Sequence, residues 1–249
     1  MRQLTQFYRT VALCAFTVAF LSVQEASAAI ITFTSELDSA SDYDSPFTVL
    51  PNSIVGAEGD LDGSVGSVVR VNTDIPSAGR AYYSFMSSAV YTPSVSGAID
   101  SIDWSTDIRK SGSPYNTPLF LALTQGGTLY MYKGEEIIGG STNTAFRPNS
   151  TTWETVSLTG AGVTDFLSYD LTQTPFSDPK VNAGDTPDFT SSGAAITFGY
   201  IGFAATSGSN LHRETEITNS SITVVPEPSA LSLMVMALLG VALVRNRKR

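Results

Sequence analysis

Short runs of apolar and β-branched residues, broken by glycine and proline, are the feature that most limits what this chain can fold into. Between residues 29 and 225, no stretch keeps apolar residues at the i, i+3, i+4 and i+7 spacing of an amphipathic helix. Turn-forming residues separate the runs, as at Asp62-Gly63, Gly126-Gly127 and Gly139-Gly140. The pattern predicts an all-β fold built from many short antiparallel strands.

Nine strands are expected in this body, and together they predict a single antiparallel β-sandwich of the jelly-roll type. The clearest hairpin is the one in which Gln125-Gly126-Gly127 forms the turn between two β-rich runs. The expected strands are Ile30–Thr34, Val65–Asn72, Ala81–Met86, Ala98–Ser105, Leu119–Thr124, Thr128–Tyr132, Thr152–Leu158, Ile196–Ala204 and Glu216–Val225.

The first 28 residues have the three parts of a secretory signal. Arg2 and Arg9 are basic, Thr10–Val23 is uncharged and apolar, and Ala26-Ser27-Ala28 places small residues at the two positions that signal peptidase reads. An uncleaved membrane anchor is the alternative, but the apolar run is short for a span of ~17–25 residues. We expect a signal helix that is removed between Ala28 and Ala29.

The last 25 residues combine three features in a fixed order. Pro226-Glu227-Pro228 interrupts regular structure, because proline lacks an N–H donor. Ser229–Val244 is uncharged, and as a helix it would be ~24 Å long, which predicts a transmembrane helix over 229–244. Basic residues follow it and are expected to stay on the cytoplasmic side, so that the body lies outside. They are Arg245, Arg247, Lys248 and Arg249.

This tail resembles the PEP-CTERM sorting signal. The resemblance implies recognition of Pro226, Glu227 and Pro228 by the membrane enzyme exosortase, and traffic together with extracellular polysaccharide. It implies a protein that is exported, held for a time in the inner membrane by its C-terminal helix, and then delivered to the cell surface or the extracellular matrix. The chain is therefore divided into a signal peptide (1–28), an ectodomain (29–224) and a sorting tail (225–249).

Charge and cysteine content exclude several functions for the ectodomain. The whole chain has a net charge of −9, and removal of the basic ends leaves −13 on the body, which disfavours nucleic acid as a partner. The only cysteine, Cys14, lies in the signal peptide. The exported protein is thus expected to have no disulfide, no thiol catalysis and no cysteine-bound zinc.

The segment from Gly199 to Val225 loosely resembles the end of carbohydrate-binding modules and concanavalin-like jelly rolls. A glycine-containing apolar strand is followed by a polar loop and a last strand that leads directly into the tail. Members of those families usually carry a tryptophan before the last strand, and Leu211–Ser221 has none. The resemblance implies a polysaccharide ligand.

Aromatic residues on strands are the candidate glycan contacts. Tyr130 and Tyr132 alternate with Met131, so the two tyrosines share one face of a strand. With Met131 in the core, the tyrosines are expected to face solvent and to stack on sugar rings. Trp153 follows a polar stretch and is the expected surface tryptophan, whereas Trp104 is expected to point inward with Ile102.

Glu58, Asp60 and Asp62 form an acidic, glycine-containing stretch, and the sequence favours a loop there. Hard cations take several oxygen ligands, so this stretch is a candidate site for structural calcium. A pair of solvated turns is the alternative reading. No other cofactor is expected.

Signals for catalysis are weak. His212 is the only histidine, and three carboxylate pairs have the potential to serve a glycosidase: Asp100 with Asp103, Asp103 with Asp107, and Glu135 with Glu136. The sequence favours a non-enzymatic protein that binds or structures polysaccharide. A secreted glycan hydrolase or lyase and a purely structural matrix protein are the alternatives.

Overall fold

The computed structural model describes the ectodomain and the first residues of the tail. The described residues are 29–34, 37, 39–43, 48–50, 53, 57–64, 68–111, 119–132, 150–170, 181–182, 184–206, 208 and 211–228. Within them, Ile30–Val225 is one compact unit. The predicted signal peptide, Met1 to Ala28, and the predicted transmembrane helix, 229–244, lie outside the described residues. Among the residues that the structure describes, no helix is long and apolar enough to span a bilayer.

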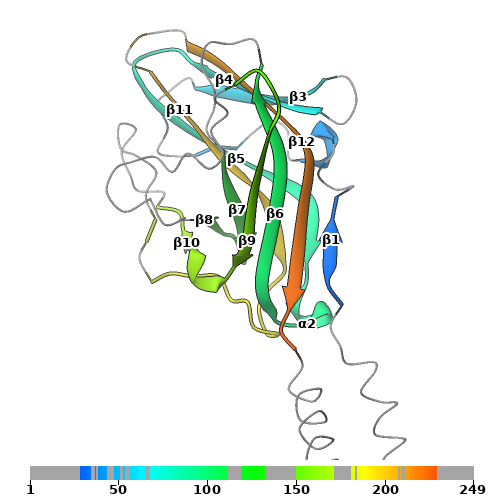
Figure 1. Cartoon of the computed structure of the whole chain (residues 1–249). Helices are drawn as coiled ribbons and strands as arrows, with labels where there is room; N and C mark the ends of the chain where they lie inside the picture. Colours follow the sequence, from blue (N-terminus) through cyan, green and yellow to red (C-terminus); the bar gives the residue numbers. More distant parts are fainter. Residues whose placement is uncertain are drawn as a thin grey trace, which may run out of the picture. The chain divides into compact units, whose positions relative to one another are not determined.

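The first sheet has the strand order β3-β4-β12-β6-β9, and β1 pairs with the end of β12 (Figure 1). Polar residues alternate with apolar ones along β4 and β6, because one face of each strand is in the core and the other faces outward. The strands of this sheet are β1 (Ile31–Phe33), β3 (Glu58–Ser64), β4 (Val68–Ile75), β6 (Ile99–Lys110), β9 (Glu154–Ala161) and β12 (Leu211–Pro226).

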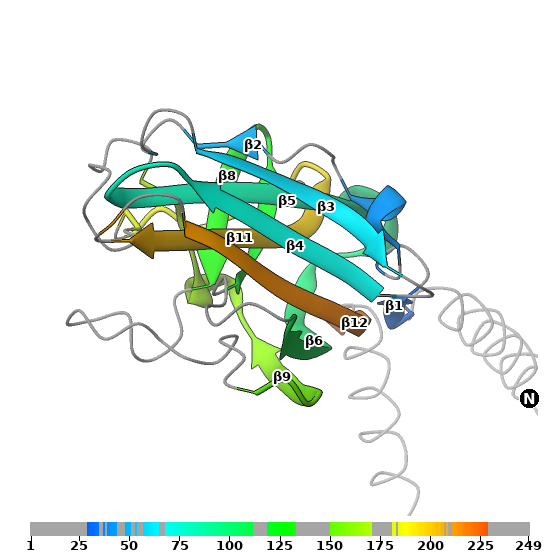
Figure 2. The same ribbon diagram turned by 90° about the horizontal axis from the view of Figure 1, so that it is seen from above.

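The second sheet packs behind the first and has the order β10-β8-β7-β11-β5-β2. Viewed from above, β3 and β4 of the first sheet cross in front of β5 and β11 of the second (Figure 2). Its strands are β2 (Thr48–Val49), β5 (Gly79–Tyr91), β7 (Leu119–Gln125), β8 (Thr128–Tyr132), β10 (Phe166–Ser168) and β11 (Ile196–Thr206). Short helical turns connect some of the strands: η3 (Ala40–Asp42), α2 (Pro93–Ser96) and η4 (Val163–Asp165).

The predicted antiparallel β-sandwich is confirmed, and each of the nine expected strands has a counterpart. The hairpin is confirmed as well: Gln125 pairs with Thr128, and Gly126 and Gly127 form the two-residue turn with φ angles of 58° and 83°. The sequence did not indicate β2, β3 or β10. Two of these strands have only two or three residues, too few for a periodic pattern.

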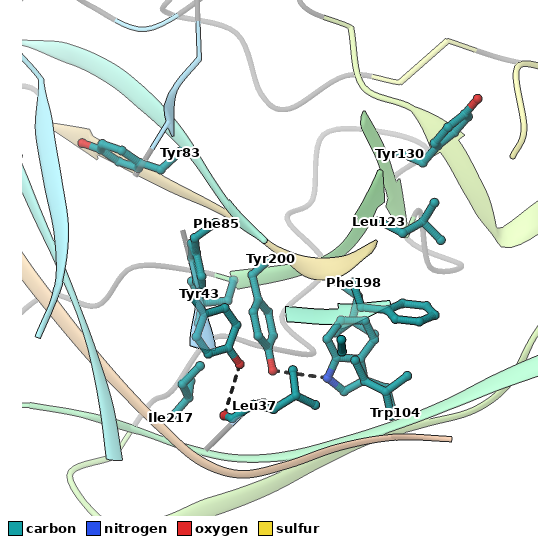
Figure 3. Close-up of a cluster of buried hydrophobic side chains, with 14 of the residues drawn as sticks. Leu37, Tyr43, Tyr83, Phe85, Trp104, Leu123, Tyr130, Phe198, Tyr200 and Ile217 are labelled. Carbon is teal, nitrogen blue, oxygen red and sulfur yellow. Dashed lines mark hydrogen bonds between the residues drawn. The ribbon is translucent and has the colours of Figure 1, made fainter. Parts of the chain in front are cut away.

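The core between the sheets is built around Tyr200 of β11 and Trp104 of β6 (Figure 3). The Trp104 Nε1 atom donates a hydrogen bond to the Tyr200 hydroxyl over 3.2 Å, and the two rings meet edge to face. Tyr200 also stacks on Phe85 with 5.3 Å between ring centroids. Its hydroxyl lies 3.3 Å from the Ser220 hydroxyl, so a polar chain joins the two sheets inside the apolar core.

The outer face of the second sheet is buried too. Continuous apolar runs along β5, β7 and β11 place side chains on both faces, and the outward ones form a second cluster. Ser53, beyond β2, holds the adjoining segment to the sheet through two hydrogen bonds between its hydroxyl and the backbone of Tyr82. The cluster contains Leu50, Tyr82, Met86, Phe120, Ala122, Met131, Tyr169 and Ile201.

A charged row crosses the outer face of the first sheet and consists of Arg70, Glu216 and Arg109. Glu216 of β12 is only 2% exposed, although it points away from the core. Its Oε1 atom accepts hydrogen bonds from Nη2 and Nε of Arg70 over 2.9 and 3.2 Å, and its Oε2 atom accepts one from Nε of Arg109 over 2.6 Å. The charged row therefore ties β4, β12 and β6 together.

Replacing Tyr200 by phenylalanine tests the polar chain through the core. The change removes the acceptor of Trp104 Nε1 and leaves a buried donor unpaired, so it should lower the free energy of unfolding by about 1–3 kcal/mol. Urea unfolding measures the effect. Tyr130→Phe is the matched control, since no hydrogen bond is recorded for that hydroxyl among the described residues. Equal stabilities for both variants would contradict the structural role of the polar chain.

Glu216 makes part of the stability dependent on pH. Burial acts to raise the pKa of Glu216, but the hydrogen bonds from Arg109 and Arg70 outweigh burial and hold the pKa below its usual 4.5. The ion pairs should therefore stabilise the fold fully above about pH 4.5 and lose this contribution as the pH falls through the lower, folded-state pKa.

Glu216→Gln should lower the free energy of unfolding by about 2 kcal/mol at pH 7. The difference between wild type and variant should shrink as the pH falls below about 4.5 and through the lower pKa of Glu216 in the folded protein. Urea unfolding at a series of pH values measures it, and a constant difference from pH 7 to pH 3 would show that Glu216 does not titrate as described.

Candidate functional site

The outer face of the first sheet carries short polar side chains on three neighbouring strands. In β6, Ile102, Trp104, Thr106 and Ile108 are buried, and the alternate residues Asp103, Ser105 and Asp107 point outward. Ser105 of β6 pairs with Ser157 of β9. We call this surface the polar face, and it consists of Asp103, Ser105, Asp107, Thr155, Ser157, Thr159, Asn219, Ser221 and Thr223.

Asp107 is held at the centre of the polar face by its neighbours on both sides. Its Oδ1 atom accepts a hydrogen bond from the Thr155 hydroxyl over 2.6 Å, and its Oδ2 atom accepts one from Asn219 Nδ2 over 2.8 Å. Both bonds hold the pKa of Asp107 below its usual value, and the bond from Asn219 has the larger effect. Asn219 can reach Asp107 because it lies at a kink in β12, with a φ angle of 49°.

The carboxylates of β6 have structural partners. Asp103 Oδ1 accepts a hydrogen bond from the backbone N–H of Gly160 over 2.7 Å. A general acid needs a raised pKa, and the pKa of Asp107 is shifted in the opposite direction. Asp100 is exposed on the same strand, and Glu135 and Glu136 lie outside the described residues. The arrangement gives Asp107 the chemistry of a fixed hydrogen-bond acceptor.

Trp153 lies at one end of the polar face, directly before β9, and its side chain is 37% exposed. The guanidinium carbon of Arg109 lies 4.3 Å from the centre of its ring. This is a cation–π contact, and it attaches the indole to the charged row. An exposed aromatic ring beside hydroxyl and carboxylate groups can bind a molecule that has both apolar and hydroxylated surfaces.

The two predicted tyrosines do not form an exposed pair. Tyr130 is 8% exposed and belongs to the core between the sheets, and Tyr132 is half-buried against that core. Met131 is buried on the opposite face, in the second cluster. The prediction that Tyr130 and Tyr132 face outward was wrong because both faces of this sheet are covered, so burial of Met131 does not leave the tyrosines in solvent.

The candidate calcium stretch forms an edge strand instead of the expected loop. Glu58, Asp60 and Asp62 lie in β3, where they pair with Asp74, Asn72 and Arg70 of β4. The side chains of Glu58, Asp60 and Asp62 lie outside the described part of the structure, and calcium binding stays a prediction.

His212 is half-exposed and forms ion pairs with two carboxylates. Its Nδ1 atom lies 2.8 Å from Asp74 Oδ1, and its Nε2 atom lies 3.1 Å from Glu214 Oε1. Both hydrogen bonds raise the pKa of His212 above its usual value, and the bond with Glu214 has the larger effect. The two carboxylates thus contact different ring nitrogens. Among the described residues, no group of three acidic, histidine or cysteine side chains is arranged to hold a metal ion.

Only the beginning of the sorting tail is described. Pro226 is the last residue of β12, and Glu227 and Pro228 are exposed immediately after it. Ala29 is exposed next to the predicted cleavage position. Ala28 and the basic residues Arg245, Arg247, Lys248 and Arg249 lie outside the described residues.

Sequence reasoning did not identify Arg109, Asp107 or Asn219 as parts of this surface. A signal was present for two of them: Ser101 to Arg109 has polar residues at each odd position, with Ile102, Trp104 and Ile108 between them. That alternation predicts one outward polar face. Nothing comparable marks Asn219, because its orientation depends on the kink in β12.

Several solved structures are similar to this chain in outline. One is the family 11 carbohydrate-binding module of a cellulosomal cellulase of Clostridium thermocellum, with a TM-score of 0.39, 12% identity, and coverage of 81% of this chain and 98% of the module. Another is an exo-beta-agarase, with a TM-score of 0.38 and 13% identity over 80% of this chain but 26% of the enzyme. A third is a xylan-binding domain from Paenibacillus barcinonensis, with a TM-score of 0.28, 8% identity, and coverage of 81% and 97%.

Sequence comparison identifies the tail. A search of curated proteins gives no match to the chain. Residues 224–248 match the model of the PEP-CTERM protein-sorting motif, as the Pro-Glu-Pro sequence and the terminal basic cluster predict. This chain therefore carries a PEP-CTERM sorting motif, the type of signal by which exosortase sorts exported proteins to the cell surface.

Proposed function

We propose that the β-sandwich binds polysaccharide outside the cell, through the polar face and Trp153. The observation that carries the proposal is the exposed indole of Trp153, which is fixed by Arg109 next to a surface of hydroxyl and carboxylate groups. A sugar ring offers a C–H face for stacking and hydroxyls for hydrogen bonding. Trp153 supplies the first kind of contact, and Asp107 with the surrounding serines and threonines supplies the second.

The exposure of Trp153 supports the proposal that the polar face binds a ligand. Among the described residues, the other large apolar side chains that are exposed are Ile30, Val90 and Val95. They belong to different elements from the polar face: Ile30 precedes β1, Val90 is in β5 and Val95 is in α2. Trp153 alone of these four is aromatic, and it is also held by a charged side chain. Aromatic residues fixed in this way are typical of contact sites.

We further propose how the protein reaches this ligand. Signal peptidase removes residues 1–28, and the 229–244 helix then holds the protein in the inner membrane until exosortase acts at Pro226-Glu227-Pro228. The end of the ectodomain supports this sequence of events, because Glu227 and Pro228 are exposed directly after β12 and are accessible to an enzyme.

Trp153→Ala tests the glycan site. The full chain, purified in detergent, is applied to a polysaccharide array with and without calcium, and the variant should bind roughly ten-fold more weakly than wild type because the stacking surface is lost. Trp153→Phe should retain part of the affinity. Val95→Ala, at an exposed site on α2, is the control and should bind as wild type does. Binding that is unchanged in Trp153→Ala would remove this surface from the proposal.

Glu227→Ala tests the sorting motif in cells that produce exosortase. The variant should accumulate in the inner-membrane fraction, because the central residue of the recognition motif is missing. Asp185→Ala, an exposed acidic position in the ectodomain, should be released as wild type is. Cell fractionation followed by immunoblotting measures the distribution, and equal release of all three proteins would mean that Glu227 is not read by the sorting enzyme.

A further inference from the structure

Arg109 covers one of the two faces of the Trp153 indole. Its guanidinium carbon lies 4.3 Å from the ring centre, which is stacking distance. A second flat group can then approach the ring only from the opposite side. The exposed surface of Trp153, 37% of the residue, is what remains after this contact.

Arg109 is held in turn by Glu216. Nε of Arg109 donates to Glu216 Oε2 over 2.6 Å, and the other carboxylate oxygen is occupied by Arg70. Glu216 is almost fully buried and has a charge that must stay paired, since an unpaired buried carboxylate is costly. Arg109 cannot swing away from Trp153 without weakening this pairing.

The four side chains form a line across four adjacent strands. Arg70 comes from β4, Glu216 from β12, Arg109 from β6, and Trp153 from the residue that precedes β9. Glu216 and Arg70 are direct cross-strand partners. Trp153, at the exposed end of this line, is thus connected through Arg109 to the buried carboxylate of Glu216.

We propose that Arg109 and Glu216 are positioning residues of the Trp153 site, which hold the indole in one orientation and leave one face for stacking. The step from an ordered indole to a bound sugar ring rests on the function proposed above; the ordering itself does not. Because the side chains are fixed before a ligand arrives, binding does not have to order them, and affinity rises accordingly.

Acrylamide quenching of tryptophan fluorescence measures the ordering without any ligand. The full chain has two tryptophans, and Trp104 is 1% exposed, so the neutral quencher reports on Trp153. Arg109→Ala uncovers the second face and should raise the quenching constant roughly two-fold. Arg109→Lys keeps the charge next to Glu216 but has no planar group to stack, so it should raise the constant with little loss of stability.

Glu216→Gln extends the test to the buried end of the line. The variant should raise the quenching constant at pH 7, although residue 216 does not touch Trp153. Lys110→Met is the matched control: it removes a charge from the neighbouring position of β6, whose side chain points to the other face of the strand. This control should leave the constant unchanged.

The outcomes separate this proposal from the one on function. Higher quenching in the Arg109 and Glu216 variants, together with weaker glycan binding, supports both. Higher quenching with no glycan binding by wild type or variants supports the positioning role and refutes the polysaccharide site. Quenching that stays at the wild-type value in folded Arg109→Lys overturns the positioning role, whatever the glycan array shows.

Discussion

The hydrogen bond between Trp104 and Tyr200 is the interaction on which the arrangement of the two sheets depends. It joins the centre of β6 to the centre of β11 in the middle of a mostly apolar core. Apolar contacts alone tolerate sliding of one sheet over the other, whereas a buried donor and acceptor have to meet at one position. Because Asp107 and Arg109 are also in β6, the relative position of the sheets fixes where these two side chains lie on the outer face. It therefore also fixes where Arg109 can contact Trp153.

Five of the six strands of the first sheet, all except β3, could be predicted from the sequence, together with the faces that they bury. Alternation of polar and apolar residues is a direct consequence of one buried and one open face, and it placed Ile102 and Trp104 in the core correctly. In the second sheet the sequence indicates strands but not what covers them. Tyr82 and Tyr83 are adjacent and lie on opposite faces of β5, yet both are fully buried because chain segments outside the sheet cover its second face.

For the candidate site as well, the sequence predicts which residue is exposed but not which residues it contacts. The exposed position of Trp153 could be predicted from the polar stretch before it, but the contacts that hold its ring could not. Arg109 and Glu216 are 107 residues apart, and their meeting depends on the pairing order of β6 and β12, which a single sequence does not reveal. The acidic stretch at Glu58 was misjudged for a related reason: glycines favoured a loop, and pairing with β4 made it a strand.

The end of β12 has a mechanical consequence. Its last residues are paired with β1 through Ile31 and Val224, and the Thr32 and Thr223 hydroxyls lie 3.0 Å apart, so the folded strand continues to the sorting motif without a slack linker. Ladder hydrogen bonds run perpendicular to the strands. Tension applied at Pro226 along the strand axis is therefore resisted by many bonds in shear at the same time, not by one bond after another. A domain tethered at this point would withstand drag from flowing water far better than one held by an edge strand that peels.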